Sequence, residues 1–593
     1  MITMIRSIAL VVAASVRVSP RQSLVCLLET LGNFVGMLQP LFIAWLVTGA
    51  IQHDAGLVIR AVICFVVSLT VVGVLMIIGN NARISQYERV GFWFDTEISR
   101  LSSSIATLDH LQSAEYQDKA QTLRDHQGLL GFAFNMVLNA LRMAVTGVGT
   151  LVLALTADPR MLLVVIAGIP AVIIARWTTR WQTTADDAAA QPSRHVKHLL
   201  ELATQPGPGA EIRVFGLQRW LRDSTDAAAR RWLDLRVDLA KRQSLLQTST
   251  TVLFFAVAGA VLAWMLRDTV AGRVSIAEFV LAASLVTRLQ MISDILQWSV
   301  RMLVRVSNDG SRFLWLRDYA ADQQARHTGT LTPPRRLHAG ISTIGLGYSY
   351  PGAETPTLTD LNLDLPAGAV VAVVGENGAG KSTLIGLLTG MLNPTEGKVL
   401  VDGVDLADLD QTKWRARMSG AFQDYARLEL TAQQSIGIGD LAALNSEPAV
   451  NAALDRAAAT DVMKALPTGL ATQLGTTWPE GVELSGGQWQ RLAIARGMMR
   501  DAPLLLVLDE PTAALDAGTE HALFERYADA ARRAGGRGGV TLLVTHRFST
   551  VASADLVVVL RGGRVAEVGT HAQLYAAGNH YAELYDLQAR GYR

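Results

Sequence analysis

The sequence Gly375-Glu376-Asn377-Gly378-Ala379-Gly380-Lys381-Ser382, followed by Thr383, decides the fold of the C-terminal half. It fits the phosphate-binding pattern G-x-x-x-x-G-K-[ST]. The apolar run Val370–Val374 before it predicts a buried strand, and the apolar run after Thr383 predicts a helix. Glycines let backbone N–H groups face a phosphate, while Lys381 and the helix N-terminus add positive charge. Ser382 is placed to put its hydroxyl on Mg²⁺.

A second apolar strand ends in two carboxylates. The hydrocarbon run Leu504–Leu508 presents Asp509 and Glu510 at its end. We expect Asp509 to hold Mg²⁺, directly or through water. Glu510 is placed to act as the general base that polarises the water attacking the γ-phosphate. A further apolar strand, Val540–Val544, delivers His546 to the same phosphate, which makes His546 a second candidate catalytic residue.

Three other positions gain weight from their place relative to these motifs. Tyr350 stands 25 residues before the phosphate loop, beside Pro351-Gly352, and an exposed aromatic ring there can stack on adenine. Gln423 ends a short segment from which its side chain can reach Mg²⁺ or the attacking water. Asp516 closes the run Ala514-Leu515-Asp516, shortly after the carboxylate pair.

The run Leu484-Ser485-Gly486-Gly487-Gln488 predicts a second anion-binding helix N-terminus. One triphosphate needs only one such cradle. A second phosphate-binding element, or phosphate grip, in the same domain therefore suggests that this element contacts a nucleotide bound by another copy of the chain. This predicts a dimer with two nucleotides sandwiched between subunits.

The composition bounds the class of protein. The chain has 593 residues, too many for one core, and half of them are hydrophobic while 18% are charged. The net charge of +1 gives no bulk field for nucleic acid, so no nucleic-acid partner is expected. The two cysteines, Cys26 and Cys64, exclude a disulfide framework.

The hydrophobic excess lies before about residue 305, where six segments are long and apolar enough to span a bilayer, which takes about 20 helical residues. The opening run Ile8–Val16 predicts an interfacial entry helix rather than a cleaved signal peptide. The fourth and fifth spans have short apolar cores. The six expected spans are Leu24–Val47, Leu57–Gly79, Leu130–Leu155, Met161–Ala175, Thr251–Leu266 and Ile276–Trp298.

Loop charges set the expected orientation. Arginine and lysine are dense before the first span and in the connections 83–128 and 176–245, and absent around Gln52-His53-Asp54. We therefore expect a multi-pass protein of the plasma membrane. The positive-inside rule places both of its termini and both long connections in the cytoplasm. The connections are polar and helix-rich, so we expect them to extend the membrane helices and turn at a short tip.

Polar side chains inside the spans are costly and suggest a function. Two stripes share a helical spacing, and two further charged residues, Arg288 and Asp294, lie in the sixth span. Either these groups line a polar cavity or they satisfy each other between helices, for example Glu29 with Arg142. As cavity lining they favour a peptide, glycosylated compound or amphipathic drug over a pure lipid. The stripes are Glu29, Asn33, Gly36, Pro40 and Asn135, Asn139, Arg142, Thr146.

The expected organisation is multidomain. An all-α transmembrane domain of six helices covers 1–305, a polar linker covers 306–338, and an α/β P-loop NTPase domain covers 339–593. In the last part strand and helix patterns alternate, as a parallel sheet requires.

These motifs together resemble the ATP-binding cassette (ABC) transporters, specifically exporter-type half-transporters with a membrane domain ahead of the cassette. Gly375–Ser382 resembles the Walker A loop, Asp509 and Glu510 the end of Walker B with its catalytic glutamate, and Leu484–Gln488 the family signature. The remaining candidates resemble the adenine-stacking residue and the Q-, D- and switch-histidine loops: Tyr350, Gln423, Asp516 and His546.

The resemblance implies two chains per transporter, ATP and Mg²⁺ as cofactors, and cytoplasmic loop tips that dock on the cassettes, here near Leu111–Tyr116 and Ala210–Phe215. Two departures stand out. Ala513 replaces a common serine, and Gly475–Gly481 lacks the usual Gly-Glu pair, whose place Glu480 or Glu483 would take.

The expected function is ATP-driven export of an unidentified substrate by alternating access. The partners would be the lipid bilayer and a second half-transporter, in a homodimer or a heterodimer. Two alternatives stay open: an importer with an exporter-like fold, and a nucleotide-gated channel or regulator.

Overall fold

The structure is a computed structural model, and it describes residues 2–205, 207–327, 329–509, 533–536, 538–545 and 551–591. The chain divides into two compact units. The first comprises residues 1–100 and 120–317, and the second comprises 101–119 and 318–593. The short segment 101–119, which lies in the helical half of the sequence, thus belongs with the C-terminal unit.

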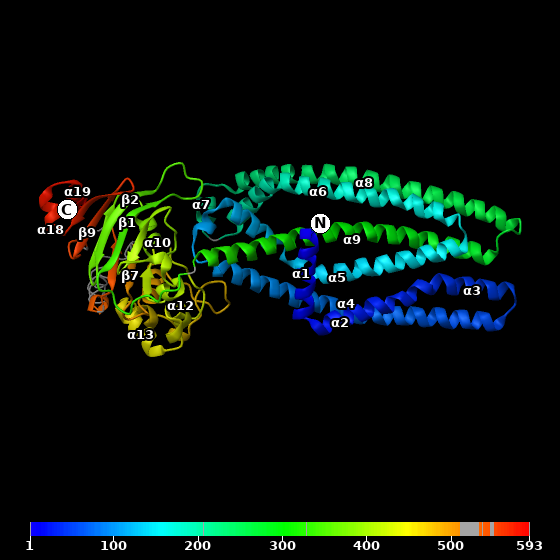
Figure 1. Cartoon of the computed structure of the whole chain (residues 1–593), viewed down its shortest axis with the longest axis horizontal. Coiled ribbons are helices and arrows are strands. Elements are labelled where there is room, and N and C mark those ends of the chain that lie inside the picture. Colours follow the sequence, from blue (N-terminus) through cyan, green and yellow to red (C-terminus); the bar gives the residue numbers. More distant parts are fainter. Residues whose placement is uncertain are drawn as a thin grey trace. The chain divides into compact units, whose positions relative to one another are not determined.

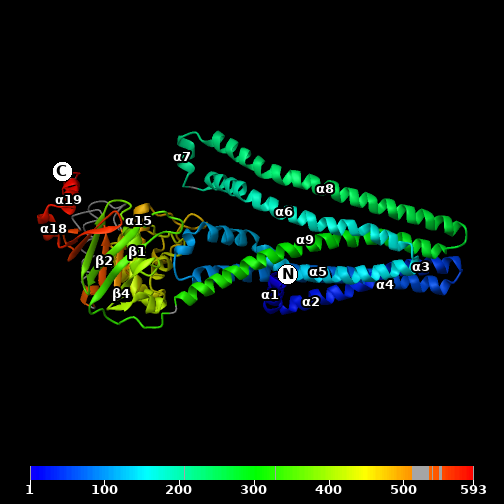
Figure 2. The same cartoon turned by 45° about the horizontal axis from the view of Figure 1, so that its top comes forward.

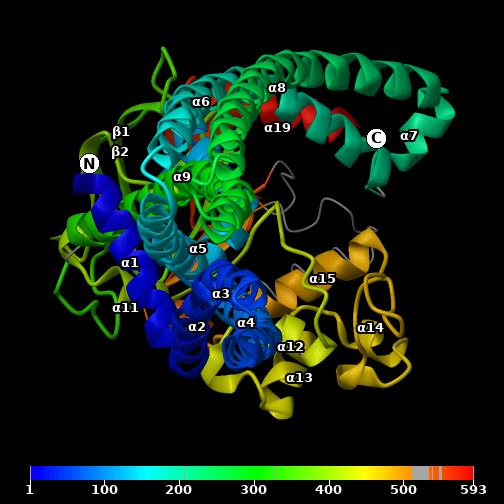
Figure 3. The same cartoon turned by 90° about the vertical axis from the view of Figure 1, so that its right-hand side faces the viewer.

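The first unit is helical, and its long helices run side by side, with α6 and α8 paired along much of their length (Figure 1, Figure 2). Viewed end-on, α5 and α9 lie among the other long helices (Figure 3). Its elements are α1 (Ile2–Val18), α2 (Pro20–Gly32), η1 (Asn33–Leu38), α3 (Gln39–Ile51), α4 (Ala55–Ser104), α5 (Ala114–Ala157), α6 (Met161–Thr204), α7 (Gly209–Val214), α8 (Gln218–Val270) and α9 (Ile276–Arg326).

Five stretches of helix in the described residues are long and apolar enough to cross a membrane, and α6 begins with a shorter apolar part, Met161–Ile174. All six predicted segments therefore fall on helices, with the fourth short as expected. The five are Pro20–Ile51, Ala55–Ser104, Gly128–Ala157, Gln218–Val270 and Ile276–Arg326.

The first predicted span, Leu24–Val47, falls within the apolar stretch Pro20–Ile51, but this stretch is not one continuous α-helix. A 3₁₀ segment, η1, separates α2 from α3. Pro40, at the start of α3, lacks the N–H that a continuous helix needs. The guanidinium of Arg288 in α9 donates to the carbonyls of Gly36 (2.8 Å) and Met37 (3.3 Å), so two carbonyls at the helix break have a hydrogen-bond donor. The stripe predicted along this span therefore changes direction at η1.

Among its described residues, the second unit has two sheets. Six strands form one sheet in the order β10-β9-β3-β8-β7-β6, in which β3 and β7 both run parallel to β8, between them. A four-stranded antiparallel sheet, β2-β1-β4-β5, was not foreseen. The strands are β1 (Gly340–Tyr348), β2 (Leu358–Pro366), β3 (Val370–Gly375), β4 (Glu396–Val401), β5 (Val404–Asp405), β6 (Met418–Ala421), β7 (Leu505–Asp509), β8 (Val540–Val544), β9 (Leu556–Arg561) and β10 (Arg564–Gly569).

Helices complete the second unit, with one core cluster joining β3, β8 and α10 and another packing α15 against β7. Because β3 and β7 are parallel, their carboxyl ends meet at one edge of the sheet. The helices are α10 (Lys381–Leu388), α11 (Gln411–Arg415), α12 (Ala432–Gly437), α13 (Glu447–Arg456), α14 (Thr460–Lys464), α15 (Gly486–Gly497), α18 (His571–Ala577) and α19 (His580–Gly591).

The two long polar connections are continuous with the apolar helices, as predicted. The first turns at η2 (Asp109–Gln112) between α4 and α5, and the second turns at α7 between α6 and α8. Helix α9 continues to Arg326, so the first part of the predicted linker 306–338 is helical.

Candidate functional site

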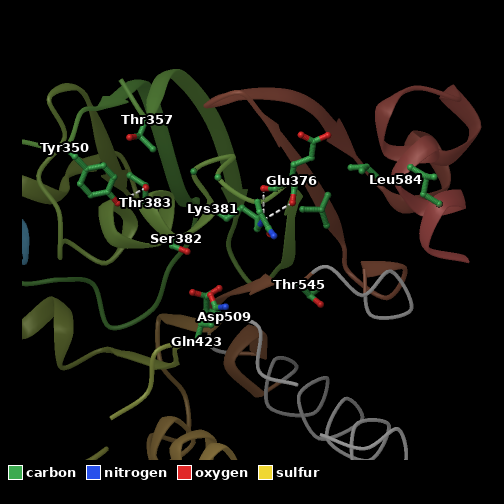
Figure 4. A pocket seen from close by; sticks show the side chains of 16 residues that line it. Tyr350, Thr357, Glu376, Lys381, Ser382, Thr383, Gln423, Asp509, Thr545 and Leu584 are labelled. Atoms are coloured by element: carbon green, nitrogen blue, oxygen red, sulfur yellow. Dashed lines mark hydrogen bonds between the residues drawn. The ribbon is translucent and has the colours of Figure 1, made fainter. Parts of the chain in front are cut away.

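The phosphate loop joins β3 to α10 and depends on glycine conformation. Gly378 (φ +82°) and Gly380 (φ +98°) both occupy the left-handed region, which side chains with a Cβ rarely adopt. Lys381 opens α10, and its Nζ donates to the carbonyls of Gly375 (2.7 Å) and Glu376 (3.0 Å) (Figure 4). The ammonium group is thus fixed above the loop whose N–H groups and helix N-terminus favour an anion.

A cleft of about 900 Å³ lies over this loop. It gathers most of the predicted nucleotide-binding residues from separate elements (Figure 4). Ala379 of the loop does not line it, and its side chain is buried. The predicted residues in its wall are Tyr350, Gly375, Glu376, Asn377, Gly378, Gly380, Lys381, Ser382, Thr383, Gln423 and Asp509.

Three oxygen-bearing side chains in the cleft suit Mg²⁺. Asp509 ends the buried strand β7, Gln423 follows β6, the neighbouring strand, and Ser382 lies in the first turn of α10. Mg²⁺ binds through one or two carboxylates together with phosphate and other oxygens. No cluster of three His, Cys, Asp or Glu side chains occurs among the described residues.

Tyr350 lines the cleft beside α10. Its hydroxyl lies 3.0 Å from Oγ1 of Thr383, the residue after Ser382. Its ring meets that of Tyr348 edge-on, with centroids 4.9 Å apart. The aromatic ring is therefore held next to the phosphate helix, in a position suited to stacking on a base.

The second predicted phosphate grip is at the start of α15. The hydroxyl of Ser485 accepts from the N–H of Gln488 (3.3 Å), and the side chain of Gln488 accepts from the N–H of Ser485 (2.9 Å), a capping box. None of the residues Leu484, Ser485, Gly486, Gly487 and Gln488 lines the cleft described above.

Three predicted residues, Glu510, Asp516 and His546, lie outside the described residues, as does Ala513. Their roles rest on the sequence alone. Of the acidic replacements proposed near the signature, Glu483 accepts a hydrogen bond from the indole of Trp489 (3.1 Å).

The cleft also contains residues that no motif indicated. Thr545 directly follows β8, so its place at the strand end was readable from the apolar run before it. Thr357 precedes β2, and Leu584 and Leu587 come from α19. Nothing in the local sequence of these three signals a pocket, because only the tertiary fold brings them there.

We predict that Gly380→Ala weakens ATP binding more than Gly378→Ala. Both variants strain a left-handed backbone, at about 1–2 kcal/mol. At Gly380 the new Cβ would also lie 2.4 Å from Cδ2 of Leu358, a fully buried side chain, whereas at Gly378 it would meet open space. Calorimetric titration with ATP checks the order, and equal affinities in the two variants would contradict it.

A second cavity, of about 400 Å³, lies among the helices of the first unit. Glu29 is buried there, and both Arg83 and Arg142 reach its carboxylate, Arg142 at 3.9 Å. Arg83 also donates to Asn139 (3.3 Å). For Glu29, Asn139 and Arg142 the two expectations thus hold together: these groups contact charged partners and line a cavity. Its lining is Glu29, Met76, Asn80, Arg83, Ile84, Tyr87, Phe132, Asn139 and Arg142.

Asn135, of the second stripe, and Asp294, of the sixth span, do not line this cavity. Asn135 is fully buried, and neither polar atom of its amide has a partner. Asp294 accepts a hydrogen bond from Gln290 one turn away (3.2 Å) and does not line the cavity.

A P-loop cassette behind a bundle of long apolar helices defines a nucleotide-binding membrane protein of the multi-pass type. Residues 358–513 match the sequence family described as ABC transporter. Over nearly the whole chain the fold is similar to a bacterial Atm1-family ABC exporter with ATP bound, with a TM-score of 0.74, 25% identity, and 97% of this chain and 99% of that chain covered.

The curated relatives are described as ATP-dependent flippases, which agrees with the family match and the similar fold. The ATP-dependent lipid A-core flippase of Psychrobacter arcticus is 34% identical over 63% of this chain and 60% of its own length. That of Nitrosococcus oceani is 28% identical over 81% of this chain and 78% of its own length. The chain spans less than two thirds of the length of the first of these relatives. Residues 358–513 thus match the ABC transporter family, and the chain as a whole has the fold of an exporter-type half-transporter.

Proposed function

We propose that this chain is one half of an ATP-hydrolysing exporter. The observation that carries the proposal is the separation of two phosphate-binding elements in one cassette. The cleft over the phosphate loop contains the oxygen donors for Mg²⁺, whereas the capped N-terminus of α15 does not line it. A second cassette would complete each site, so the active form is a dimer with two shared nucleotides.

The two states of this dimer would differ in their affinity for ATP. Binding closes the cassettes because each nucleotide bridges two chains, and a ligand shifts an equilibrium only by its differential affinity for the two states. In the closed dimer Lys381 would hold the phosphates, and Ser382, Gln423 and Asp509 would hold Mg²⁺, which would supply positive charge to the bound triphosphate. Glu510 would orient and deprotonate the attacking water, with His546 beside it, so that hydrolysis resets the transporter.

The division of the chain into domains and its orientation in the membrane are also part of this proposal. Residues 1–305 form the membrane domain, 306–338 the linker and 339–593 the cassette. The protein lies in the plasma membrane, with the cassette and both termini on its cytoplasmic side. The arginine-rich connections support this orientation. Since every catalytic motif is intact in the sequence, a homodimer would be self-sufficient, and in a heterodimer this chain would be the competent partner.

The cavity of the helical unit supports an amphiphile with an anionic head group as the substrate. Two guanidinium groups, of Arg83 and Arg142, face one carboxylate, of Glu29, which leaves an excess positive charge beside apolar side chains such as Ile84 and Phe132. The relatives are described as lipid A-core flippases, which also act on an amphiphile. This favours a lipid-like molecule over the peptides and drugs that the polar stripes alone suggested.

The test uses sealed vesicles of phosphatidylethanolamine and phosphatidylglycerol containing the purified chain and a fluorescent phosphatidylglycerol. Only cassettes that face outward meet added Mg-ATP, so export moves the label from the outer to the inner leaflet, where dithionite does not quench it. We expect ATP to increase the protected fraction and Arg142→Gln to slow the increase about tenfold, since a charge-assisted hydrogen bond contributes about 1.5–3 kcal/mol.

A matched control is Arg60→Gln, an exposed arginine in α4, which should transport at the normal rate. Movement of the label in the opposite direction would replace export by import. Movement supported equally by a non-hydrolysable ATP analogue would identify a nucleotide-gated channel instead. The relatives and the solved exporter favour export over both.

A further inference from the structure

The segment 101–119 contacts the cassette at the end of the helix that starts in the phosphate loop. The N–H of Leu108 donates to the carbonyl of Met391 (2.8 Å). The guanidinium of Arg415 joins the carbonyls of Ala106 (2.5 Å) and Gly390 (3.1 Å). Gly390 and Met391 follow α10 directly, so one rigid helix separates this contact from Lys381.

A second contact connects the same segment to the base side of the cleft. The hydroxyl of Tyr348 donates to Oδ1 of Asp109 at 2.6 Å. The ring of Tyr348 meets that of Tyr350 at 90°, with centroids 4.9 Å apart, and Tyr350 lines the nucleotide cleft. The side chains of Tyr350 and Tyr348 therefore connect the wall of the cleft to Asp109.

Through this bridge of Tyr350 and Tyr348, a restriction of one side chain can reach Asp109. Tyr348 is only 2% exposed, at the end of β1, so its ring has little freedom of its own. Burial, and then the bond to Asp109, raise the pKa of Tyr348 well above its ordinary value, so the phenol stays a donor at any physiological pH. Tyr350 is only half-buried, and its ring is the one part of the bridge that a bound base would touch.

We propose that Tyr348 and Asp109 are positioning residues that report the presence of an adenine base on Tyr350 to the segment 101–119. Stacking of a base restricts the ring of Tyr350, which packs edge-on against Tyr348 and so stabilises the orientation in which Tyr348 holds Asp109. The phosphates act on the same segment through α10 and Met391. The segment would thus respond separately to the base and to the phosphates, an inference that rests on the proposed nucleotide site.

The two inputs can be separated with two ligands. Mg-AMP-PNP supplies base and phosphates, and Mg-tripolyphosphate supplies phosphates alone. Hydrogen exchange of the amides of residues 106–113 is measured on the full chain at saturation with each. In the wild-type protein we expect AMP-PNP to slow exchange about fivefold or more beyond tripolyphosphate, the lower end of typical coupling between sites.

Tyr348→Phe removes the donor and keeps the ring contact, and Asp109→Ala removes the acceptor. Each variant, and the double variant equally, should lose the base-dependent slowing while binding AMP-PNP within about threefold of the wild-type affinity. Tyr575→Phe is the matched control, because Tyr575 also donates to a carboxylate, of Asp586 (3.2 Å), outside the bridge. It should leave the slowing unchanged.

The outcomes are distinguishable. Slowing that persists in either Tyr348→Phe or Asp109→Ala, or its absence in a wild-type protein that binds AMP-PNP, would overturn the inference alone. A wild-type protein that binds no AMP-PNP would overturn the proposed function as well. Loss of the slowing in Tyr575→Phe too would show a general loosening of the cassette and likewise overturn the inference.

Discussion

Glu510→Gln is expected to lower ATP turnover by about 10²–10⁴-fold, the usual contribution of a positioned general base. Glutamine keeps the shape of the side chain but accepts no proton, so ATP still binds and the closed dimer accumulates. Turnover is measured as phosphate release by the purified chain, and the dimer by size-exclusion chromatography with ATP. The charge of Asp509, at the end of β7, is untouched, so binding of Mg²⁺ should persist.

The matched control is Glu447→Gln, an exposed glutamate at the start of α13 and far in sequence from every motif. It should hydrolyse ATP at the normal rate and show no extra dimer. Normal turnover in Glu510→Gln would remove Glu510 as the base and leave the nucleotide site standing.

The parallel strands of the cassette could be predicted because each is a short apolar run ending in a chemical motif. Val370–Val374, Leu504–Leu508 and Val540–Val544 correspond to β3, β7 and β8 to within a residue. A strand buried on both faces has no polar alternation, so its length and its flanking glycines or carboxylates identify it. The antiparallel sheet around β1 and β4 carries no such motif, and its pairing is set by tertiary contacts.

Helix breaks and partners were harder to predict. Apolar periodicity does not distinguish a continuous α-helix from α2, η1 and α3, although Pro40 was a usable signal. Arg83 was assigned to a polar connection because the apolar run stops at Gly79. The helix α4 continues past that point, and Arg83 reaches back to Glu29. Hydropathy marks where a span ends, but it does not show which charged side chains return to the cavity.

The site was predictable where chemistry needs particular residues and not where it needs only shape. Lys381, Ser382 and Asp509 all line the cleft, as the proposed phosphate and Mg²⁺ site requires. Leu584 and Leu587 fill its wall with apolar surface, which many residues could supply. The contacts of segment 101–119 were expected only as docking, since a sequence does not show that Asp109 meets Tyr348.

Lys381→Ala is expected to weaken ATP binding about 10- to 150-fold, because a charge-assisted hydrogen bond contributes about 1.5–3 kcal/mol and each 1.4 kcal/mol is tenfold in affinity. The wild-type ammonium group is fixed on the carbonyls of Gly375 and Glu376, so its loss also loosens the loop. Calorimetry with ATP gives the affinity, and the same sample in size-exclusion chromatography should stay undimerised at ATP concentrations that saturate the wild-type protein.

This variant and Glu510→Gln separate binding from chemistry. Both should lower turnover, but only Lys381→Ala should also prevent dimerisation, because the dimer is held by bound nucleotide and not by hydrolysis. Lys413→Ala, which removes an exposed lysine paired with Asp410 (2.9 Å), is the control and should bind ATP normally. A Lys381→Ala protein that still dimerises with ATP at wild-type concentrations would show that the cassettes associate without a shared nucleotide, contrary to the arrangement that the separated phosphate grips imply.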